Sequence, residues 1–385
     1  MPARFGTSEL IARLVAFPTV SDNSNLDLIA FVQDYLAGWE VPARLTYDKD
    51  KRKANLFATV GSGPGGIVLS GHTDVVPVVD QSWSSDPFRT VERDGRLYGR
   101  GTADMKSFLA LVLARVPDLV QRRLPEPVHL SLSYDEELGC LGVPSLIADL
   151  AAAGIRPRLA LIGEPTLMQV ANAHKSRQSF ETRIRGVPGH ASHPERGVSA
   201  IEAAGEALAF IGRLAAEARA RARADSDFAP PHTTYNVGTL AGGSAINIIA
   251  PSARFGWEFR TVPWDSPAEE LQRFTGFVEQ DLKPRLKARA AEADIETETL
   301  SWVAGLVPDP SSPAERLALA LTGLNRPRTI SFGTEAGLFQ EAGIPAVICG
   351  PGSIEQAHRA DEYIELSQIA ACDAFLDRLI QRLTG

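Results

Sequence analysis

The sequence has little cysteine and no long apolar run. Its three cysteines, Cys140, Cys349 and Cys372, lie far apart and form no CxxC pair. A disulfide framework and a cysteine-based metal site are therefore not expected, and an odd, scattered set is typical of a reducing compartment. No stretch is apolar enough to span a bilayer, and the N-terminal stretch, residues 1–18, lacks the continuous apolar core of a signal peptide. These features predict a soluble, cytoplasmic protein without a membrane partner.

The chain also lacks an excess of positive charge. It has 39 Lys and Arg against 47 Asp and Glu, which gives a net charge of -8. This balance argues against a nucleic-acid partner. A length of 385 residues exceeds the usual size of one domain, and a hydrophobic content of 44% is ordinary for a globular protein, so two domains are expected.

Helix and strand patterns alternate in the first part of the chain. Short apolar strands separated by amphipathic helices are typical of an α/β fold with a mostly parallel sheet. The expected helices are residues 7–16, 27–37, 105–119 and 143–152, and the expected strands are residues 55–60, 66–69, 128–134 and 159–162.

The pattern changes near residue 176 and returns to the first type near residue 303. Between these points we expect strands at residues 179–184, 234–240, 246–261 and 295–302, with long helices at residues 199–223 and 267–291. Two helices on a four-stranded antiparallel sheet, in a ferredoxin-like order, would form an independent α+β domain. The predicted organisation is a discontinuous domain of residues 1–178 and 303–385 with an inserted domain of residues 179–302. A strand at residues 346–349 and a helix at residues 366–383 complete the first domain.

Histidines and acidic residues follow the predicted strands of the first domain. In open parallel sheets, binding groups gather beyond the carboxyl ends of the strands, so these side chains are expected at one site. They are His72 and Asp74 in GHTDVVPV, Asp104 in GRGTADMK, Glu136 and Glu137 in YDEELG, Glu164 in IGEPT, and His358 in AHRADEY.

Each of these residues also has an ordinary structural interpretation. Polar residues often end a strand, and Asp104 suits the cap of the helix that follows it. Glu136 and Glu137 would suit a solvated loop, Glu164 a turn before Pro165, and His358 an exposed loop. Their joint placement favours a single functional site.

Such a site requires cations. Four carboxylates with only two neutral imidazoles would repel one another in a partly desolvated cleft. A mixed set of histidine and carboxylate ligands suits zinc, cobalt or manganese, and two ions fit if one carboxylate bridges them.

The motifs above, together with GVPGHASHP, resemble the dinuclear-zinc amidohydrolase family that includes acetylornithine deacetylase, succinyl-diaminopimelate desuccinylase, aminoacylase and related carboxypeptidases. The resemblance covers nearly the whole chain, with the motifs in the family's order. It implies that His72 and Glu164 bind one zinc ion, that Glu137 and His358 bind the other, and that Asp104 bridges them. It also implies a cis peptide bond between Asp104 and Met105.

The same resemblance implies the catalytic roles. Glu136 matches the general base, which takes a proton from water and passes it to the leaving amine. Asp74 matches the carboxylate that orients His72. His190, in the inserted domain, matches a histidine that stabilises the oxyanion of a partner subunit, which implies a homodimer. An ordinary turn residue is the alternative for His190.

The substrate is expected to be a small N-acyl amino acid. Asn247 and Arg260 match substrate-binding positions, and the fork of an arginine suits a carboxylate. Thr334 and Glu335, in SFGTEAG, match a further substrate loop, and Glu335 would favour a cationic side chain if it faced the pocket. The stretches LIGEPT, AHKS and FGTEAGLFQEAGIPAVICGPG are most similar to the acetylornithine deacetylases of the family.

Three other functions stay open from the sequence. One is another N-acyl amino acid hydrolase, namely a desuccinylase, an acetylcitrulline deacetylase or an aminoacylase. A second is a dipeptide exopeptidase of the same family, which would differ only in the pocket. The third is an inactive metal-binding scaffold, which the presence of Glu136 and all five ligands disfavours.

Overall fold

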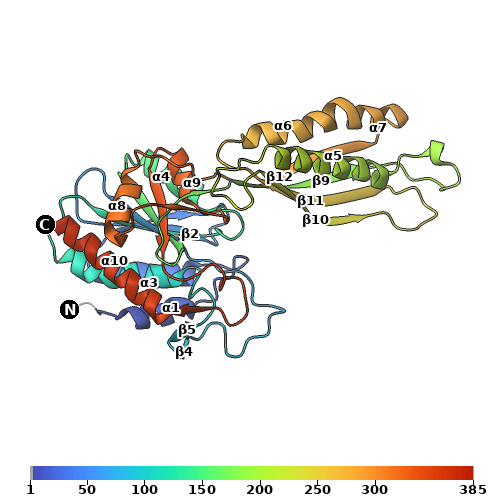
Figure 1. Ribbon diagram of the computed structural model, residues 1–385. Helices are drawn as coiled ribbons and strands as arrows, with labels where there is room; N and C mark the ends of the chain where they lie inside the picture. Colours follow the sequence, from blue (N-terminus) through green and yellow to red (C-terminus); the bar gives the residue numbers. More distant parts are fainter. Residues whose placement is uncertain (1–2, 385) are drawn as a thin grey trace. The chain divides into compact units, whose positions relative to one another are not determined.

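The computed structural model describes residues 3–384, which form two compact units (Figure 1). The first unit contains the chain up to Ala173, residues 306–329 and the residues from 334 onward. The second contains residues 174–305 and 330–333, and the expected inserted domain lies inside its main segment.

A mixed sheet of eight strands forms the centre of the first unit. The strands are β1 (Ala43–Tyr47), β2 (Ala54–Val60), β3 (Ile67–His72), β6 (Val128–Ser133), β7 (Leu159–Pro165), β8 (Ala171–His174), β13 (Arg328–Ile330) and β14 (Ala346–Gly350). Their order is β1-β2-β6-β3-β7-β14-β8-β13. The four central strands, β6, β3, β7 and β14, are parallel, whereas β2 and β8 run antiparallel to their central neighbours.

The strand order reverses at β3, in the middle of this sheet. From β3 the chain passes through a helix to β6 on one side, and then crosses back to β7 on the other side. Ligands bind in α/β sheets where the strand order reverses in this way. The residues at the carboxyl ends of β6, β3, β7 and β14 are therefore neighbours.

Helices cover both faces of the sheet, which explains why the central strands are buried throughout. In Figure 1, α3, α10 and α1 lie below the sheet, and α4 and α9 lie above it. Along β6 the apolar side chains of Val128, Leu130 and Leu132 alternate with His129, Ser131 and Ser133, and all six are buried. The helices of the unit are α1 (Thr7–Val15), α2 (Leu26–Gly38), α3 (Lys106–Val120), α4 (Val143–Ala152), α8 (Pro313–Thr322), α9 (Ala336–Glu341) and α10 (Leu366–Thr384).

A small three-stranded sheet joins the segment before Asp104 to the segment after His358. Its strands, β4 (Val91–Arg93), β5 (Arg96–Tyr98) and β15 (Tyr363–Glu365), have the order β15-β5-β4. β5 precedes Asp104 and β15 follows His358, so this pairing brings two segments together that are more than 260 residues apart in the sequence, such as Tyr98 and Tyr363.

The second unit has the predicted α+β architecture. Its strands are β9 (Arg177–Arg185), β10 (Thr234–Gly242), β11 (Ser252–Arg260) and β12 (Asp294–Val303), in the antiparallel order β10-β11-β9-β12. Its helical segments are η1 (Pro194–Arg196), α5 (Ala200–Ala220), α6 (Pro267–Phe277), η2 (Val278–Leu282) and α7 (Lys283–Arg289). Small alanines of α5 let this helix pack closely on Phe180, Phe255 and Trp257 of the sheet. This is the ferredoxin-like order, and the predicted fold class is confirmed.

Two elements of this unit differ from the sequence prediction. The strand expected at residues 246–261 begins only at Ser252, because Pro251 has no N–H to donate to a ladder. The helix expected at residues 267–291 is interrupted by a π-helical segment, Val278–Leu282, which ends two residues before Pro284. The missing N–H of Pro284 explains this local change of hydrogen bonding.

Among residues 3–384, no helix combines the length and apolar character that crossing a bilayer requires.

Candidate metal centre

His72 is the last residue of β3, at the carboxyl end of this strand, with only 1% of its surface exposed. Its ring nitrogen Nδ1 lies 2.9 Å from the main-chain oxygen of Asp74, and Nε2 lies 2.9 Å from Oδ1 of Asp104. A bond to a carbonyl oxygen requires the proton on Nδ1, which leaves Nε2 of the neutral ring free to bind a cation.

Asp104 faces both of the predicted histidine ligands. Its Oδ1 points to His72, and its Oδ2 lies 3.4 Å from Nε2 of His358. The alternative role as a helix cap is not observed, because Met105 is the N-cap of α3 and no side chain caps that helix. The Asp104–Met105 peptide bond is cis, as the resemblance implies. One oxygen toward each histidine is the arrangement that a bridging ligand needs.

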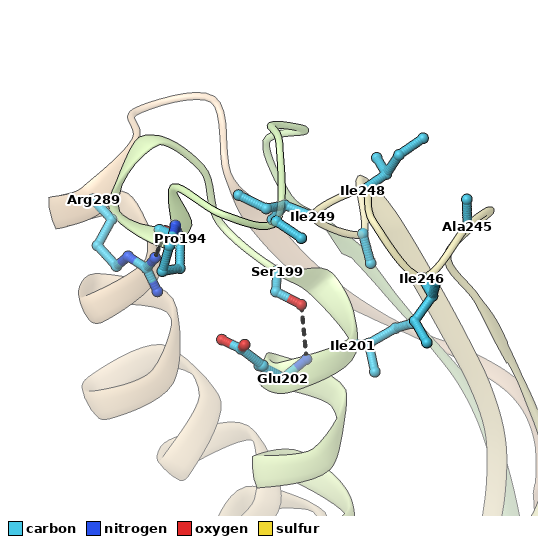
Figure 2. A pocket seen from close by; sticks show the side chains of 11 residues that line it. Pro194, Ser199, Ile201, Glu202, Ala245, Ile246, Ile248, Ile249 and Arg289 are labelled. Carbon is cyan, nitrogen blue, oxygen red and sulfur yellow. Dashed lines mark hydrogen bonds between the residues drawn. The ribbon is translucent and has the colours of Figure 1, made fainter.

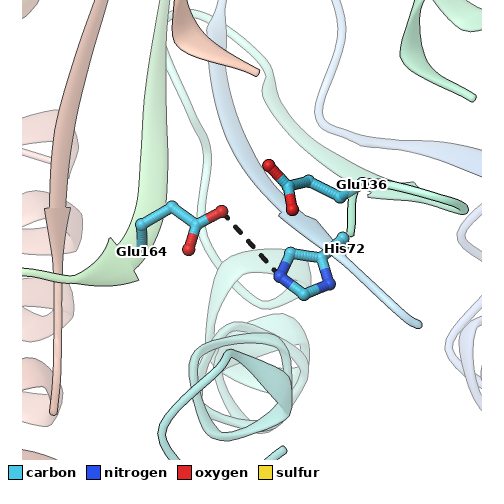
Figure 3. Close-up of side chains that lie close together, drawn as sticks. All are labelled: His72, Glu136 and Glu164. Atoms are coloured by element: carbon cyan, nitrogen blue, oxygen red, sulfur yellow. Dashed lines mark ion pairs between the residues drawn. The ribbon is translucent and has the colours of Figure 1, made fainter. Parts of the chain in front are cut away.

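The other predicted ligands converge on the same place. Nε2 of His358 lies 3.0 Å from Oε2 of Glu137, and Oε1 of Glu164 lies 3.8 Å from Nε2 of His72. Figure 3 shows Glu164, Glu136 and His72 turned toward a shared space. Candidate ligand atoms lie within 4.8 Å of one another in two overlapping groups, namely His72, Glu136 and Glu164, and His72, Asp104 and Glu137.

The charges of the site are unfavourable without a cation. Burial raises the pKa of Glu136 to about 8, against the opposing effect of His72 and with a smaller contribution from the nearby Glu137. Burial and the charge of Asp104 likewise raise the pKa of Glu137 and of Glu164. These carboxyl groups retain protons that a divalent ion would displace.

The pKa values of His358 and Asp104 shift in opposite directions. Hydrogen bonds to Asp104 and Glu137 raise the pKa of His358 to about 10. Burial by itself would raise the pKa of Asp104, but hydrogen bonds from His358 and His72 lower it below its ordinary value. The carboxylates therefore favour a positive charge in the site, and a metal ion would supply one.

The donor atoms therefore fit a metal centre of nitrogen and oxygen ligands. His72, Glu164 and Asp104 would hold one ion, and His358, Glu137 and Asp104 would hold another. Histidine and carboxylate donors suit zinc, cobalt and manganese.

The position of Asp74 corrects part of the sequence interpretation. The nearest partner of Nδ1 of His72 is the main-chain oxygen of Asp74, and the Asp74 carboxylate lies farther from it, at 3.5 Å. The carboxylate instead accepts the N–H groups of Glu136, at 3.1 Å, and Glu137, at 3.3 Å, and the hydroxyl of Ser21, at 2.8 Å. Asp74 thus orients the chain that carries the expected base as well as the histidine.

Glu136 has one further partner within the first unit. The buried thiol of Cys140 lies 3.3 Å from Oε1 of Glu136 and donates to it. Burial and the charge of Glu136 raise the pKa of this thiol, so it keeps its proton and remains a donor.

The structure corrects the expectation for Thr334 and Glu335. Both side chains are buried, and the hydroxyl oxygen of Thr334 accepts the N–H of Ala336. The carboxylate of Glu335 accepts the hydroxyl groups of Ser133 in β6 and Ser70 in β3, and only 1% of the residue's surface is exposed. Burial raises the pKa of Glu335 to about 7, while the bond from Ser133 opposes this change.

His190 and Asn247 are neighbours in the second unit. Ala191 donates its N–H to the main-chain oxygen of Asn247 at 3.1 Å, and a β-bridge joins His190 to Ile248. Both side chains are exposed, and the ring of His190 is oriented by the hydroxyl of Ser192, 2.7 Å from Nδ1. Arg260 ends β11 and pairs with Glu258 at 2.9 Å.

A pocket of about 350 Å³ lies beside this pair of segments (Figure 2). Ile201, Ile246 and Ile248 line it, and the guanidinium of Arg289 holds the loop after His190 through the main-chain oxygens of Pro194 and Gly197. The loop that carries His190 is therefore fixed within its own unit.

Sequence reasoning did not identify Ser21 or Glu362 as residues of the site. Ser21 lies 53 residues before Asp74, and no motif marks it. Glu362 lies in AHRADEY, and the N–H groups of Ala103 and Asp104 donate to its carboxylate. An acidic residue inside a ligand motif was the available signal for Glu362.

The chain resembles a known protein family and curated proteins over most of its length. Residues 68–382 match the model of the peptidase family M20/M25/M40. A protein of Proteus mirabilis (strain HI4320) named acetylornithine deacetylase is 35% identical over 385 aligned residues, which cover 97% of this chain and 95% of that protein.

Solved structures share the fold at low sequence identity. A metallo-carboxypeptidase of the M20 family from Sulfolobus solfataricus has a TM-score of 0.75 and 16% identity, with 98% of this chain and 99% of that chain covered. A Bacillus subtilis protein described as a dinuclear metal-binding peptidase of the M20 family has a TM-score of 0.64 and 16% identity, with 98% and 97% covered.

Proposed function

The chain belongs to the peptidase family M20/M25/M40, and from this premise we propose that it removes the acetyl group from N2-acetyl-L-ornithine, giving ornithine and acetate. This reaction is the hydrolysis of an amide bond and supplies ornithine for arginine biosynthesis. One observation carries the proposal: Asp104 turns one oxygen toward His72 and the other toward His358, and the half-buried Glu136 lies beside them.

The proposed cofactor is a pair of divalent ions, zinc in the first place, with cobalt or manganese as alternatives. Such ions, when bound, lower the pKa of water and polarise the amide carbonyl. The chain would hold them through His72 and Glu164, through His358 and Glu137, and through Asp104 between them. The name of the similar Bacillus subtilis structure supports the number of ions.

Glu136 would move the proton of the reaction. It would accept a proton from the attacking water and deliver it to the departing amine of ornithine. A carboxyl group with a pKa of about 8 in the metal-free site is suited to both steps, because each bound cation lowers that value toward neutrality. Glu136 would be held in place by two bonds: its backbone N–H donates to the Asp74 carboxylate, and its own carboxylate accepts the thiol of Cys140.

Residues of the second unit would bind the substrate. Arg260 would grip the α-carboxylate, Asn247 would bind beside it, and His190 would donate a hydrogen bond to the oxyanion of a partner subunit. We therefore propose a homodimer formed through the second unit. A cytoplasmic location agrees with the three buried cysteines, none of which forms a disulfide.

The test is a panel of acylated substrates offered to metal-replete and to chelated protein. N2-acetylornithine, succinyl-diaminopimelate, acetylcitrulline, other N-acetyl amino acids and dipeptides should be compared by kcat/KM. The proposal expects N2-acetylornithine to be the best substrate, with activity that disappears on chelation and returns with added zinc. A different best substrate would reassign the enzyme within its family.

A Glu136→Gln variant separates an enzyme from a scaffold. General-base catalysis contributes on the order of 10²- to 10⁴-fold, so kcat should fall by about that factor while metal content stays at the wild-type level. Activity at the native rate in this variant would rule out the proposed mechanism.

A further inference from the structure

A buried ion pair lies behind two of the proposed metal ligands and is not itself part of the ligand set. Nη1 of Arg100 lies 2.7 Å from Oε2 of Glu362, and each side chain has about 1% of its surface exposed. Buried ion pairs are weak evidence for stability, because desolvation of both charges offsets their attraction. The other partners of the two residues suggest a more specific role.

Glu362 binds the turn that ends in Asp104. Its Oε1 accepts the N–H groups of Ala103, at 2.9 Å, and of Asp104, at 3.1 Å. Its main-chain oxygen accepts the N–H of Gly99, at 2.9 Å. One residue therefore holds both ends of the turn from Gly99 to Asp104, and it does so from a position four residues after His358.

Arg100 connects the same turn to His358 through Gln81. Nη2 of Arg100 donates to Oε1 of Gln81 at 2.6 Å, and Nε2 of Gln81 donates to the main-chain oxygen of His358 at 3.1 Å. The guanidinium also lies over the ring of Trp83, 5.0 Å from its centroid. An unbroken chain of hydrogen bonds thus runs from the N–H of Asp104 to the carbonyl of His358.

The backbone of His358 needs such support. Its φ is +63°, in the left-handed region that non-glycine residues rarely adopt, and its side chain is 53% exposed. Few packing contacts can fix an exposed ring on a backbone of this kind, so hydrogen bonds to the main chain have a larger share in setting its position.

We propose that Glu362, Arg100 and Gln81 position Asp104 and His358 relative to each other and thereby set the affinity of the metal site that these two ligands share with Glu137. The inference rests on the proposed pair of ions, and it assigns Gln81 to the ion that His358 and Glu137 would hold, because Asp104 also faces His72. His72 and Glu164, which are held by β3 and β7, lie outside this chain of bonds.

Gln81 offers the cleanest substitution, because it can be changed without leaving a buried charge unpaired. Gln81→Glu keeps an acceptor for Arg100 but removes the N–H group that donates to the main-chain oxygen of His358. Gln81→Ala removes both bonds, while Arg100 keeps its pairing with Glu362. Ser84→Ala is the matched control, because Ser84 lies on the same segment and binds Asp361 instead of His358.

The experiment uses the full chain, stripped of metal by chelation and titrated with Co²⁺ alone. Binding is followed by the visible absorption of the ion and by counting bound metal after dialysis. We expect the wild type and Ser84→Ala to bind two ions. Both Gln81 variants should bind one ion, the one assigned to His358 and Glu137, about 10- to 100-fold less tightly and the other ion unchanged, the range seen when groups that orient metal ligands are removed.

Unchanged binding of both ions in folded Gln81 variants would overturn the proposal, as would an equal loss at both sites or a wild type that binds one ion. The proposed function fails separately. A wild type that binds two ions but does not hydrolyse N2-acetylornithine would refute the assigned activity and leave the positioning role intact.

Discussion

The carboxylate of Asp74 accepts the backbone N–H of Glu136 at 3.1 Å. The same arrangement occurs at Asp104, whose backbone N–H donates to the carboxylate of Glu362 at 3.1 Å. Each buried carboxylate fixes the main chain beside a group that must face the cations. A hydrogen bond from an N–H to a charged acceptor is stronger than one to a neutral acceptor, so these two residues can impose an orientation on otherwise irregular loops.

We first predict that Asp74→Asn lowers kcat by about 10- to 100-fold. An amide has only one acceptor oxygen, whereas Asp74 accepts bonds from Ser21, Glu136 and Glu137. The NH₂ group would face one of these donors and displace the chain that carries the proposed base. Steady-state kinetics with metal analysis measures the effect, and Asp22→Asn, an exposed neighbour, is the control. Wild-type kcat in Asp74→Asn would contradict the positioning role.

A second prediction concerns the stability of the chelated protein. Glu136 has a pKa of about 8 in the folded protein, against an ordinary value of 4.5. Between these values the folded state keeps a proton that the unfolded state releases, so stability falls as pH rises through that window. The rise in the pKa of His358, to about 10, acts in the same direction above pH 6.5.

Glu136→Gln isolates this contribution, because glutamine stays neutral at every pH. Between pH 5 and 8 the chelated wild type should lose stability relative to the variant by an amount on the order of a few kcal/mol. Urea unfolding at several pH values measures the difference. Addition of zinc should reduce it, since bound cations favour the ionised carboxylate. Parallel pH profiles of the two chelated proteins would refute the burial effect assigned to Glu136.

Much of the site could be predicted because its residues directly follow strong local patterns. The apolar run Ile67, Val68 and Leu69 predicts β3, and His72 is the residue that ends it. Similarly, Ser199 precedes an alanine-rich amphipathic stretch, and it caps α5 by accepting the N–H of Glu202. Local periodicity and capping depend on residues that are close in the chain, so they can be recognised in a single sequence.

Other features depend on contacts that no local pattern records. The pairing of Arg100 with Glu362 joins residues 262 positions apart, and a buried carboxylate there looks like a surface residue in the sequence. The burial of Glu335 against Ser70 and Ser133 is of the same kind. The hairpin of β4 and β5 is different, because its Asp94-Gly95 turn, with φ of +52° and +71°, carries a recognised signal that the sequence interpretation passed over.

A third prediction follows from the burial of Glu335. The resemblance suggested that this carboxylate attracts a cationic side chain, whereas the structure binds it to two serine hydroxyls. Glu335→Gln should therefore leave the ratio of kcat/KM for N2-acetylornithine and an uncharged N-acetyl amino acid within about twofold of the wild type. Glu341→Gln, an exposed change on α9, is the control. A strong loss of preference for N2-acetylornithine would restore Glu335 as a substrate residue.

The last prediction compares two Gly→Ala substitutions of opposite expected sign. A Cβ at Gly350 would lie 2.0 Å from the main-chain oxygen of Gly163 and 2.6 Å from that of Glu164, because β14 and β7 approach closely there. Neither atom can move without separating the strands that position Glu164. Gly350→Ala should lower the free energy of unfolding by about 3 kcal/mol or more, the upper range for overpacking, and should weaken zinc binding.

At Gly205, inside α5, a Cβ would meet no atom within 4 Å. Gly205→Ala should stabilise the protein by about 0.5 to 1 kcal/mol, since alanine restricts the unfolded chain more than glycine does. Urea unfolding of the zinc-loaded protein measures both changes, and equal stability of the two variants would contradict the close approach of β14 and β7.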